Sequence, residues 1–293
     1  MNALVEGRNA AESAAASALG RLVRRHDHDR FLTTLFAPAG AREALLALYA
    51  FNYEVAKTRE VVTEPALGSI RLRWWRDALD TAYGDTPLRR HEVAEPLGRA
   101  VRGRSLSRAH FEALLAARET DLEDEAPADL DALESYAEAS SARLVLLALE
   151  VLGEGAAAAQ AAGRAIGIAY ALSGLLRAVP FHARAKRLYL PRDLVEAAQI
   201  DLARGLFELR SSPALRRVVG EVAARAEAHL GAARALRPQI PRTALPALLP
   251  AVLARADLAR LARGGYDPFA PAIARPDPWR SWRLALASLR GRY

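Results

Sequence analysis

The 293-residue sequence contains no cysteine, and only two of its 41 basic residues, Lys57 and Lys186, are lysines. Without cysteine the chain has no disulfide framework, no thiolate metal site and no cysteine nucleophile. It also lacks the GxGxxG and P-loop patterns that bind phosphates, and the HExxH and GxSxG patterns of metalloproteases and serine hydrolases. The sequence therefore gives no motif for those classes of enzyme.

Long uncharged segments are also absent. Ala165–Leu176 and Thr243–Ala254 are each 12 residues long, whereas roughly 18 or more apolar residues are needed to cross a bilayer. Residues 1–25 carry Glu6 and Glu12 and have no continuous apolar stretch, which is typical of a peripheral amphipathic helix and not of a secretory signal. We therefore expect no transmembrane segment.

What the chain does have is apolar residues at helical spacing almost throughout. Leu45, Leu48, Phe51 and Val55 form one such stripe, and a second joins Ile70, Trp74 and Leu79. No stretch alternates as a strand does. The pattern predicts one all-α domain over residues 1–293 with about eight to eleven helices. The predicted helices cover residues 41–60, 66–82, 107–124, 129–152, 156–179, 212–236, 243–262 and 278–290.

Two acidic clusters invite a metal interpretation. In HDHD at 26–29, adjacent side chains of a helix point in different directions, so a helix start capped by Asp27 or Asp29 is favoured over a metal site. In ETDLEDE at 119–125, Asp121 and Glu125 have the spacing of a Mg²⁺–diphosphate site. The same run closes a helix, so a solvated helix end is the favoured interpretation there.

RLRWWR at 71–76 interleaves arginine with two indoles, and the whole chain has a formal net charge of +7. Arginine beside aromatic rings can bind single-stranded nucleic acid. On a helix, however, we expect one tryptophan in the core and the other under an arginine side chain. We therefore predict no nucleic-acid partner and assign most of the arginine to solvated helix faces.

Five stretches, taken in order, resemble the squalene/phytoene synthase family. They are HDRFLTTLFAP (28–38), LYAFNYEVAKTRE (48–60), IRLRWWRDAL (70–79), ESYAEASSARLVLLALEVLG (134–153) and GIAYALSGLLRAVPFHARAKRLYLPRDLV (167–195). The resemblance implies the isoprenoid synthase fold, in which helices surround a central cavity. It also implies an enzyme that joins two prenyl diphosphates head to head.

The family's chemistry uses two aspartate pairs, each at i and i+4, that hold Mg²⁺ on diphosphate. The matching positions in this chain are Ala56 and Glu60, and Ala178 and His182, which we expect to face a common cavity. One carboxylate of four remains, so the resemblance implies no catalytic residue and no metal ligand. No cofactor is expected, and Mg²⁺ only if the chain is an enzyme. Candidate ligand-binding residues are Tyr49, Tyr53, Arg177, His182, Tyr189 and Asp193, with Arg177 and a charged His182 as the pair that would hold an anion.

The stretch LLRAVPFH at 175–182 further resembles a non-enzymatic branch of the family, the mitochondrial complex I assembly factors. The resemblance implies an accessory factor whose partners are respiratory complex I subunits or a membrane surface. It would be cytoplasmic and peripheral at the inner membrane, or on the matrix side in a mitochondrion. Two alternatives remain open. One is a head-to-head prenyltransferase of squalene, phytoene or hopanoid precursor synthesis, and the other is a protein that binds a prenyl or lipid phosphate.

Overall fold

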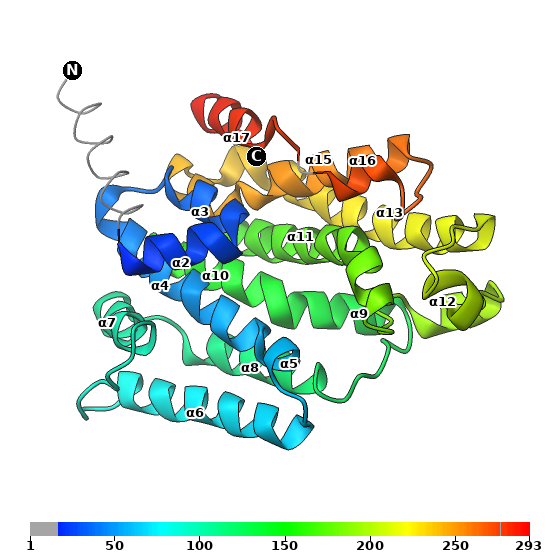
Figure 1. Cartoon of the computed structure of the whole chain (residues 1–293). Helices are drawn as coiled ribbons and strands as arrows, with labels where there is room; N and C mark the ends of the chain where they lie inside the picture. Colours follow the sequence, from blue (N-terminus) through cyan, green and yellow to red (C-terminus); the bar gives the residue numbers. More distant parts are fainter. Residues whose placement is uncertain (1–16, 276) are drawn as a thin grey trace.

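The structure, a computed structural model, describes residues 17–275 and 277–293 (Figure 1). Within these residues the chain forms helices and turns and no strand, which confirms the all-α prediction. The α-helices of eight or more residues are α2 (Ala18–His26), α4 (Ala39–Ala56), α6 (Pro65–Tyr83), α7 (Ala94–Arg104), α8 (Arg108–Thr120), α9 (Leu130–Ala137), α10 (Arg143–Val151), α11 (Ala157–Arg184), α13 (Pro213–Leu236), α15 (Pro250–Arg263) and α17 (Arg280–Leu289).

Shorter helical segments connect these helices. They are α3 (His28–Thr34), α5 (Thr58–Val61), α12 (Arg192–Ala197), α14 (Leu245–Leu248), α16 (Pro271–Ala274), the π-helical turns η1 (Glu138–Ala142) and η2 (Leu202–Leu206), and the 3₁₀ turns η3 (Arg237–Gln239) and η4 (Arg242–Ala244). The predicted helix 129–152 is thus one helical run, α9–η1–α10, interrupted by a π turn. Such turns insert one extra residue into a helix and often lie at functional sites.

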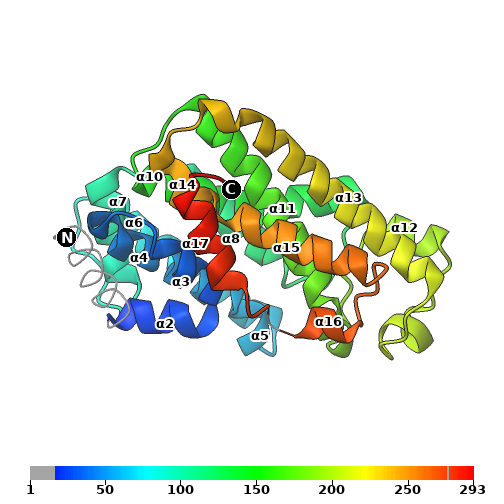
Figure 2. The same cartoon turned by 90° about the horizontal axis from the view of Figure 1, so that it is seen from above.

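Helix α11 forms the centre of the bundle, where it packs against α10, η1, α13 and α15 (Figures 1 and 2). The predicted stripe of Leu45, Leu48, Phe51 and Val55 is fully buried on α4, which packs against α2, α7 and α10. The stripe predicted for α6 was wrong at Ile70, which is 67% exposed. The buried residues of this helix include Leu72 and Trp75 instead, because the inward face is rotated from the predicted one.

By length and composition alone, α11 is the one helix among the described residues that could cross a bilayer. The sequence predicted none, because charges and polar residues divide its apolar runs. Half of the relevant window is buried inside the protein. Since α11 packs against α10, α13, α15 and further helical segments, its apolar character is that of a core helix.

Other boundaries also differ from the sequence prediction. Helix α7 was not predicted at all, and the predicted helix 243–262 is divided at Leu249 into α14 and α15. We expected α11 to stop at 179, but it continues through Pro180 to Arg184. A proline removes only one backbone donor, and here it lies close to the end of a long, well-packed helix. Of the predicted N-terminal helix, α2 is observed, whereas residues 1–16 lie outside the described residues.

Two glycines of α11 make a matched test of this packing. A Cβ at Gly167 would lie 2.3 Å from the Cα of Ala142 in η1, whereas a Cβ at Gly174 would meet no atom within 4 Å. We predict that Gly167→Ala lowers the free energy of unfolding by about 1–3 kcal/mol, because backbone atoms must move apart. Gly174→Ala should raise it by about 0.5–1 kcal/mol through helix propensity. Urea unfolding of both variants measures the difference, and equal stabilities would contradict the close packing of α11 on η1.

Candidate functional site

The four positions that match the family's aspartates lie at the ends of two helices. Ala56 is the last residue of α4 and Glu60 lies in α5, while Ala178 and His182 lie in the last two turns of α11. Glu60 is exposed and the other three are half-buried. Methyl groups cannot coordinate a metal, and Mg²⁺ prefers oxygen to imidazole nitrogen. Among residues 17–275 and 277–293 no group of three His, Asp or Glu could hold a metal ion. These side chains therefore do not fit a Mg²⁺–diphosphate site.

The cations that flank the first pair of positions are bound by the protein's own carboxylates. Lys57 and Arg71 both contact the buried carboxylate of Glu54, the latter at 2.7 Å. Arg59 forms an ion pair with the carboxylate of Asp124. Arg187 contacts the same carboxylate at 3.2 Å. The hydrogen bond from Arg59 is the main reason that the pKa of Asp124 is lowered. Lys57 and Arg59 are therefore ion-paired within the protein, although each carboxylate is shared by two cations.

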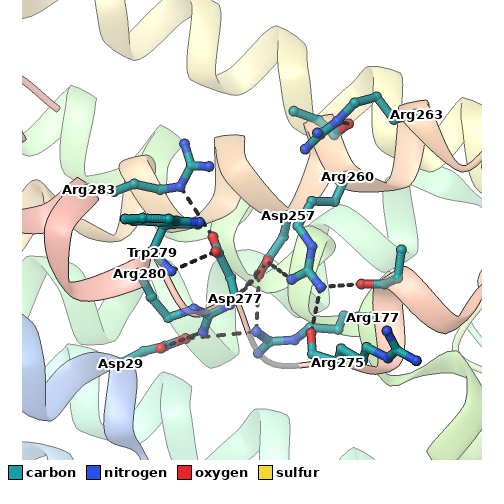
Figure 3. Close-up of polar contacts among 12 residues, drawn as sticks. Asp29, Arg177, Asp257, Arg260, Arg263, Arg275, Asp277, Trp279, Arg280 and Arg283 are labelled. Carbon is teal, nitrogen blue, oxygen red and sulfur yellow. Dashed lines mark hydrogen bonds and ion pairs between the residues drawn. The ribbon is translucent and has the colours of Figure 1, made fainter.

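A larger set of ion pairs, here called the hub, lies beside the second pair of positions and consists of Asp29, Arg177, Asp257 and Arg280 (Figure 3). Arg280 of α17 donates through Nη1 to both oxygens of Asp29 in α3. Through Nη2 it donates to both oxygens of Asp257 in α15, at 3.0 and 3.1 Å. Arg177, next to Ala178 in α11, donates to Asp257 at 3.1 Å and lies 3.9 Å from Asp29. The hub thus joins four helices that are far apart in the sequence.

The two aspartates of the hub are buried, and each is balanced by arginine. Asp29 also accepts a hydrogen bond from the hydroxyl of Tyr170, at 3.2 Å. Although burial acts in the opposite direction, the two carboxylates raise the pKa of Arg280. A third guanidinium, that of Arg260 in α15, lies 3.7 Å from Asp257. Arg177 is therefore already ion-paired with the carboxylates of the hub.

A second polar cluster is centred on Asp121, which follows α8. Its carboxylate accepts hydrogen bonds from Arg118 at 3.0 Å, Tyr136 at 3.1 Å and Tyr189 at 3.0 Å. The favoured interpretation of the run 119–125 is confirmed for the helix end and for the exposed residues Glu123–Glu125, but both interpretations were wrong for Asp121 itself. The residue is buried, so it is not a solvated helix end, and α8 ends at Thr120, so Asp121 and Glu125 do not share a helical face. We call Arg118, Asp121, Tyr136 and Tyr189 the tyrosine–aspartate cluster.

His182 of α11 packs against this cluster, with its ring centroid 4.4 Å from that of Tyr189. Burial is the main cause that lowers the pKa of His182 to about 4, and the charge of Arg187 lowers it further, against a smaller opposing effect of Asp121. The imidazole is therefore neutral near pH 7. The expectation that a charged His182 helps to hold an anion was wrong, because the sequence does not reveal the burial of this ring.

The six candidate ligand-binding residues do not form one site. Tyr49 is buried beneath Arg30, Tyr53 stacks on His26 at 4.1 Å, and Arg177 belongs to the hub. Asp193 is exposed at the start of α12. Among the six, His182 and Tyr189 are the pair that the structure brings into ring contact.

A pocket of about 570 Å³ opens beside the tyrosine–aspartate cluster. Asp121, Tyr136 and Tyr189 contribute polar groups to its lining, and its walls are formed by α8, α9, η1 and the segment 187–189. The apolar wall residues are Ala113, Ala116, Ala117, Ala126, Pro127, Ala132, Ala139 and Leu188. Glu123, Asp124, Glu125 and Arg187 also line it. None of the four aspartate-matching positions does so. The sequence analysis missed this pocket, although the small residues at 113, 116 and 117 recur at helical spacing.

Two further sequence predictions are confirmed. Asp27 caps α3 by accepting from the backbone N–H of Arg30 at 3.2 Å, as expected for a polar helix start. Trp75 is buried in the core, and the guanidinium of Arg89 lies 5.5 Å from the ring centroid of Trp74. The RLRWWR stretch is thus a structural part of α6.

The hub yields a stability prediction. We expect Arg280→Ala to lower the free energy of unfolding by about 3–5 kcal/mol, because Asp29 and Asp257 lose their shared buried partner. The control is Arg99→Ala on α7, which removes an exposed i, i+4 pair with Glu95 and should change stability by less than about 1 kcal/mol. Thermal or urea unfolding measures both. Equal small effects would show that the hub does not hold the helices together.

Comparison with known proteins gives consistent matches over nearly the whole chain. The family model described as squalene/phytoene synthase matches residues 23–289. The NADH dehydrogenase (ubiquinone) complex I, assembly factor 6, of Bos taurus is 32% identical over 299 residues, which cover 99% of this chain and 88% of that protein.

Solved structures match as well. The squalene synthase HpnC from Alicyclobacillus acidocaldarius superposes with a TM-score of 0.75 at 22% identity, covering 90% of this chain and 97% of that one. A dehydrosqualene synthase in complex with ligand superposes with a TM-score of 0.79 at 19% identity, covering 97% of both chains. These structures confirm the expected isoprenoid synthase fold.

Proposed function

This chain belongs to the squalene/phytoene synthase family, and within that family we propose that it is a non-catalytic accessory factor for the assembly of respiratory complex I. The observation that carries the proposal is the chemistry of the four positions that match the family's metal-binding aspartates. They hold two alanines, one histidine and one glutamate. A catalyst of this mechanism needs several carboxylates to hold Mg²⁺ against the leaving diphosphate, and this set offers one.

The ion pairs around these positions support the proposal. Glu54 and Asp124 bind the cations that flank the first motif, and the hub binds Arg177 beside the second. A diphosphate would have to compete with these carboxylates and would find no metal to offset its own charge. The side chains thus stabilise the frame of the fold and do not prepare a site for departing diphosphate.

We infer the role from the names of the relatives. The Bos taurus and Homo sapiens proteins called complex I assembly factor 6 are 32% and 30% identical to this chain, each over 99% of its length. We infer that this chain acts on complex I subunits before or during their assembly. Its place would then be the surface of the membrane that holds complex I, on the side of the cytoplasm or the mitochondrial matrix.

A complementation experiment tests the role. Cells that lack their own assembly factor 6 should recover assembled complex I, seen on native gels and as NADH dehydrogenase activity, when this chain is expressed in the same compartment. Purified protein given farnesyl or geranylgeranyl diphosphate, Mg²⁺ and NADPH should form no squalene or phytoene. Turnover in this assay would favour the prenyltransferase alternative, and a well-folded, abundant protein that restores no complex I would contradict the accessory role.

The pocket favours a second candidate function, the binding of a prenyl or other lipid chain. Its alanine-lined walls suit an apolar chain, and the polar groups of Asp121, Tyr136 and Tyr189 in its lining suit a polar head. Four carboxylates line the pocket, those of Asp121, Glu123, Asp124 and Glu125, against the single arginine Arg187, so repulsion disfavours a phosphate head. We therefore propose that a neutral chain such as farnesol binds more tightly than its phosphate.

Titration of farnesol and farnesyl phosphate in the presence of EDTA tests this order. Ala139→Phe should weaken farnesol binding by about tenfold or more, because the ring occupies the pocket. The control is Ala66→Phe, which adds the same ring at an exposed position of α6. Tighter binding of the phosphate, or equal binding by both variants, would contradict the assignment of this pocket.

A further inference from the structure

The C-terminal helix α17 has an apolar stripe that points into solvent. Trp279, Trp282, Leu286 and Leu289 recur at the three- and four-residue spacing of one helix face, and their exposed fractions are 61%, 72%, 48% and 79%. The opposite face of α17 holds the helix on the protein through buried Leu284, partly buried Ala287 and Arg280 of the hub. Helix α17 thus has one apolar face that packs on the protein and a second apolar face, the stripe, that no part of the described chain covers.

The charge around the stripe is predominantly positive, although Asp277 lies just before it and pairs with Arg283 at 3.2 Å. From Pro278 to Tyr293 the sequence contains four arginines and neither aspartate nor glutamate. Arg283 and Arg290 are exposed and lie on the helix between the solvent-facing stripe and the buried face. Arginine therefore borders one edge of the stripe, while Ser281 and Ser288 lie along the other edge.

Neighbouring helices extend this positive surface. Arg234 of α13 and Arg255 of α15 are exposed and line a groove of about 300 Å³, in which Glu227 is the acidic residue. Burial and then the charges of Arg234, Arg237 and Arg283 lower the pKa of Arg255, so these four arginines lie close together. Figure 2 shows α13, α15 and α17 together on the face of the molecule that is seen from above.

Hydrogen bonds hold the C-terminal end of α17 on the protein. Arg237 donates to the backbone carbonyl of Tyr293, and Arg242 donates to that of Leu289 at 3.2 Å. The Tyr293 hydroxyl in turn donates to the carbonyl of Ala233 at 3.0 Å. The stripe is therefore presented on a fixed helix, and no rearrangement is needed before it contacts a partner.

We propose that this face, the α17 stripe with its flanking arginines, docks the protein on an anionic lipid bilayer. Tryptophan prefers the boundary between headgroups and acyl chains, and leucine inserts just below it. Arginine at the edge of the stripe and in the groove then pairs with lipid phosphates. A fixed helix with an apolar stripe and a cationic border lies in the plane of such an interface. This proposal does not depend on the accessory role in complex I assembly.

Vesicle flotation of the whole chain tests the proposal. Binding to phosphatidylcholine vesicles that contain phosphatidylglycerol should exceed binding to pure phosphatidylcholine, and it should weaken as salt rises. Trp282→Ser with Leu286→Ser should reduce the binding constant by about tenfold or more. The control is Leu67→Ser with Ile70→Ser, which removes comparable exposed apolar side chains from α6 and should leave binding unchanged.

A second pair of variants tests the charge. Arg290→Gln with Arg292→Gln should weaken binding to the anionic vesicles and flatten its salt dependence, whereas Arg99→Gln with Arg210→Gln on other surfaces should not. Absence of vesicle binding, or an equal loss in the α17 and control variants, would overturn the proposal. So would a dimer in solution that the Trp282→Ser and Leu286→Ser changes dissociate, since the stripe would then be covered by a second copy of the chain.

Discussion

The ion pairs of Arg280 with Asp29 and Asp257 determine how the C-terminal part of the protein sits on the rest. Helix α17 buries Leu284 fully and little else, so apolar packing alone holds it weakly. The half-buried guanidinium of Arg280 supplies the missing specificity, because any other orientation of α17 would remove one cationic partner from each of two buried carboxylates. The same pairs fix Arg177 and with it the end of α11. The same ion pairs therefore determine the orientation of the α17 stripe and the position of the α11 turn that carries Ala178 and His182.

Ion pairs lie close to the helix ends that carry the four aspartate-matching positions. In the family that this chain resembles, metal ions and diphosphate balance each other between two helices. Here, carboxylates of the chain pair with its own cations close to the same helix ends, at Glu54, Asp124 and the hub. Such ion pairs stabilise the fold without a ligand, close to the positions that match the family's aspartates. Retention of the fold is therefore physically compatible with the absence of a carboxylate at three of those four positions.

The sequence predicted the helices well where apolar residues repeat every three or four positions, as in α4 and α13, since periodicity is a local property. It failed at Ile70 because two neighbouring faces of α6 have similar apolar content, and the choice between them depends on which helices pack there. It also failed at Pro180, where tertiary packing outweighs one lost hydrogen bond. The hub joins residues 29 and 280, and no local pattern links them. Likewise, Asp121 became a buried acceptor only because Tyr136 and Tyr189 approach it from other segments.

The pocket and the α17 stripe lie on different sides of the bundle. Figure 1 places α17 at the top of the molecule, while α8, which forms one wall of the pocket, lies below α10 and α11. A bilayer that contacts α17 would therefore leave the acidic rim of the pocket facing water. The charges agree with this orientation, because the arginine-rich face is attracted to anionic headgroups and the rim with Glu123, Asp124 and Glu125 is repelled by them. Docking on lipid would then present the pocket side, and not the α17 side, to any protein partner at the membrane surface.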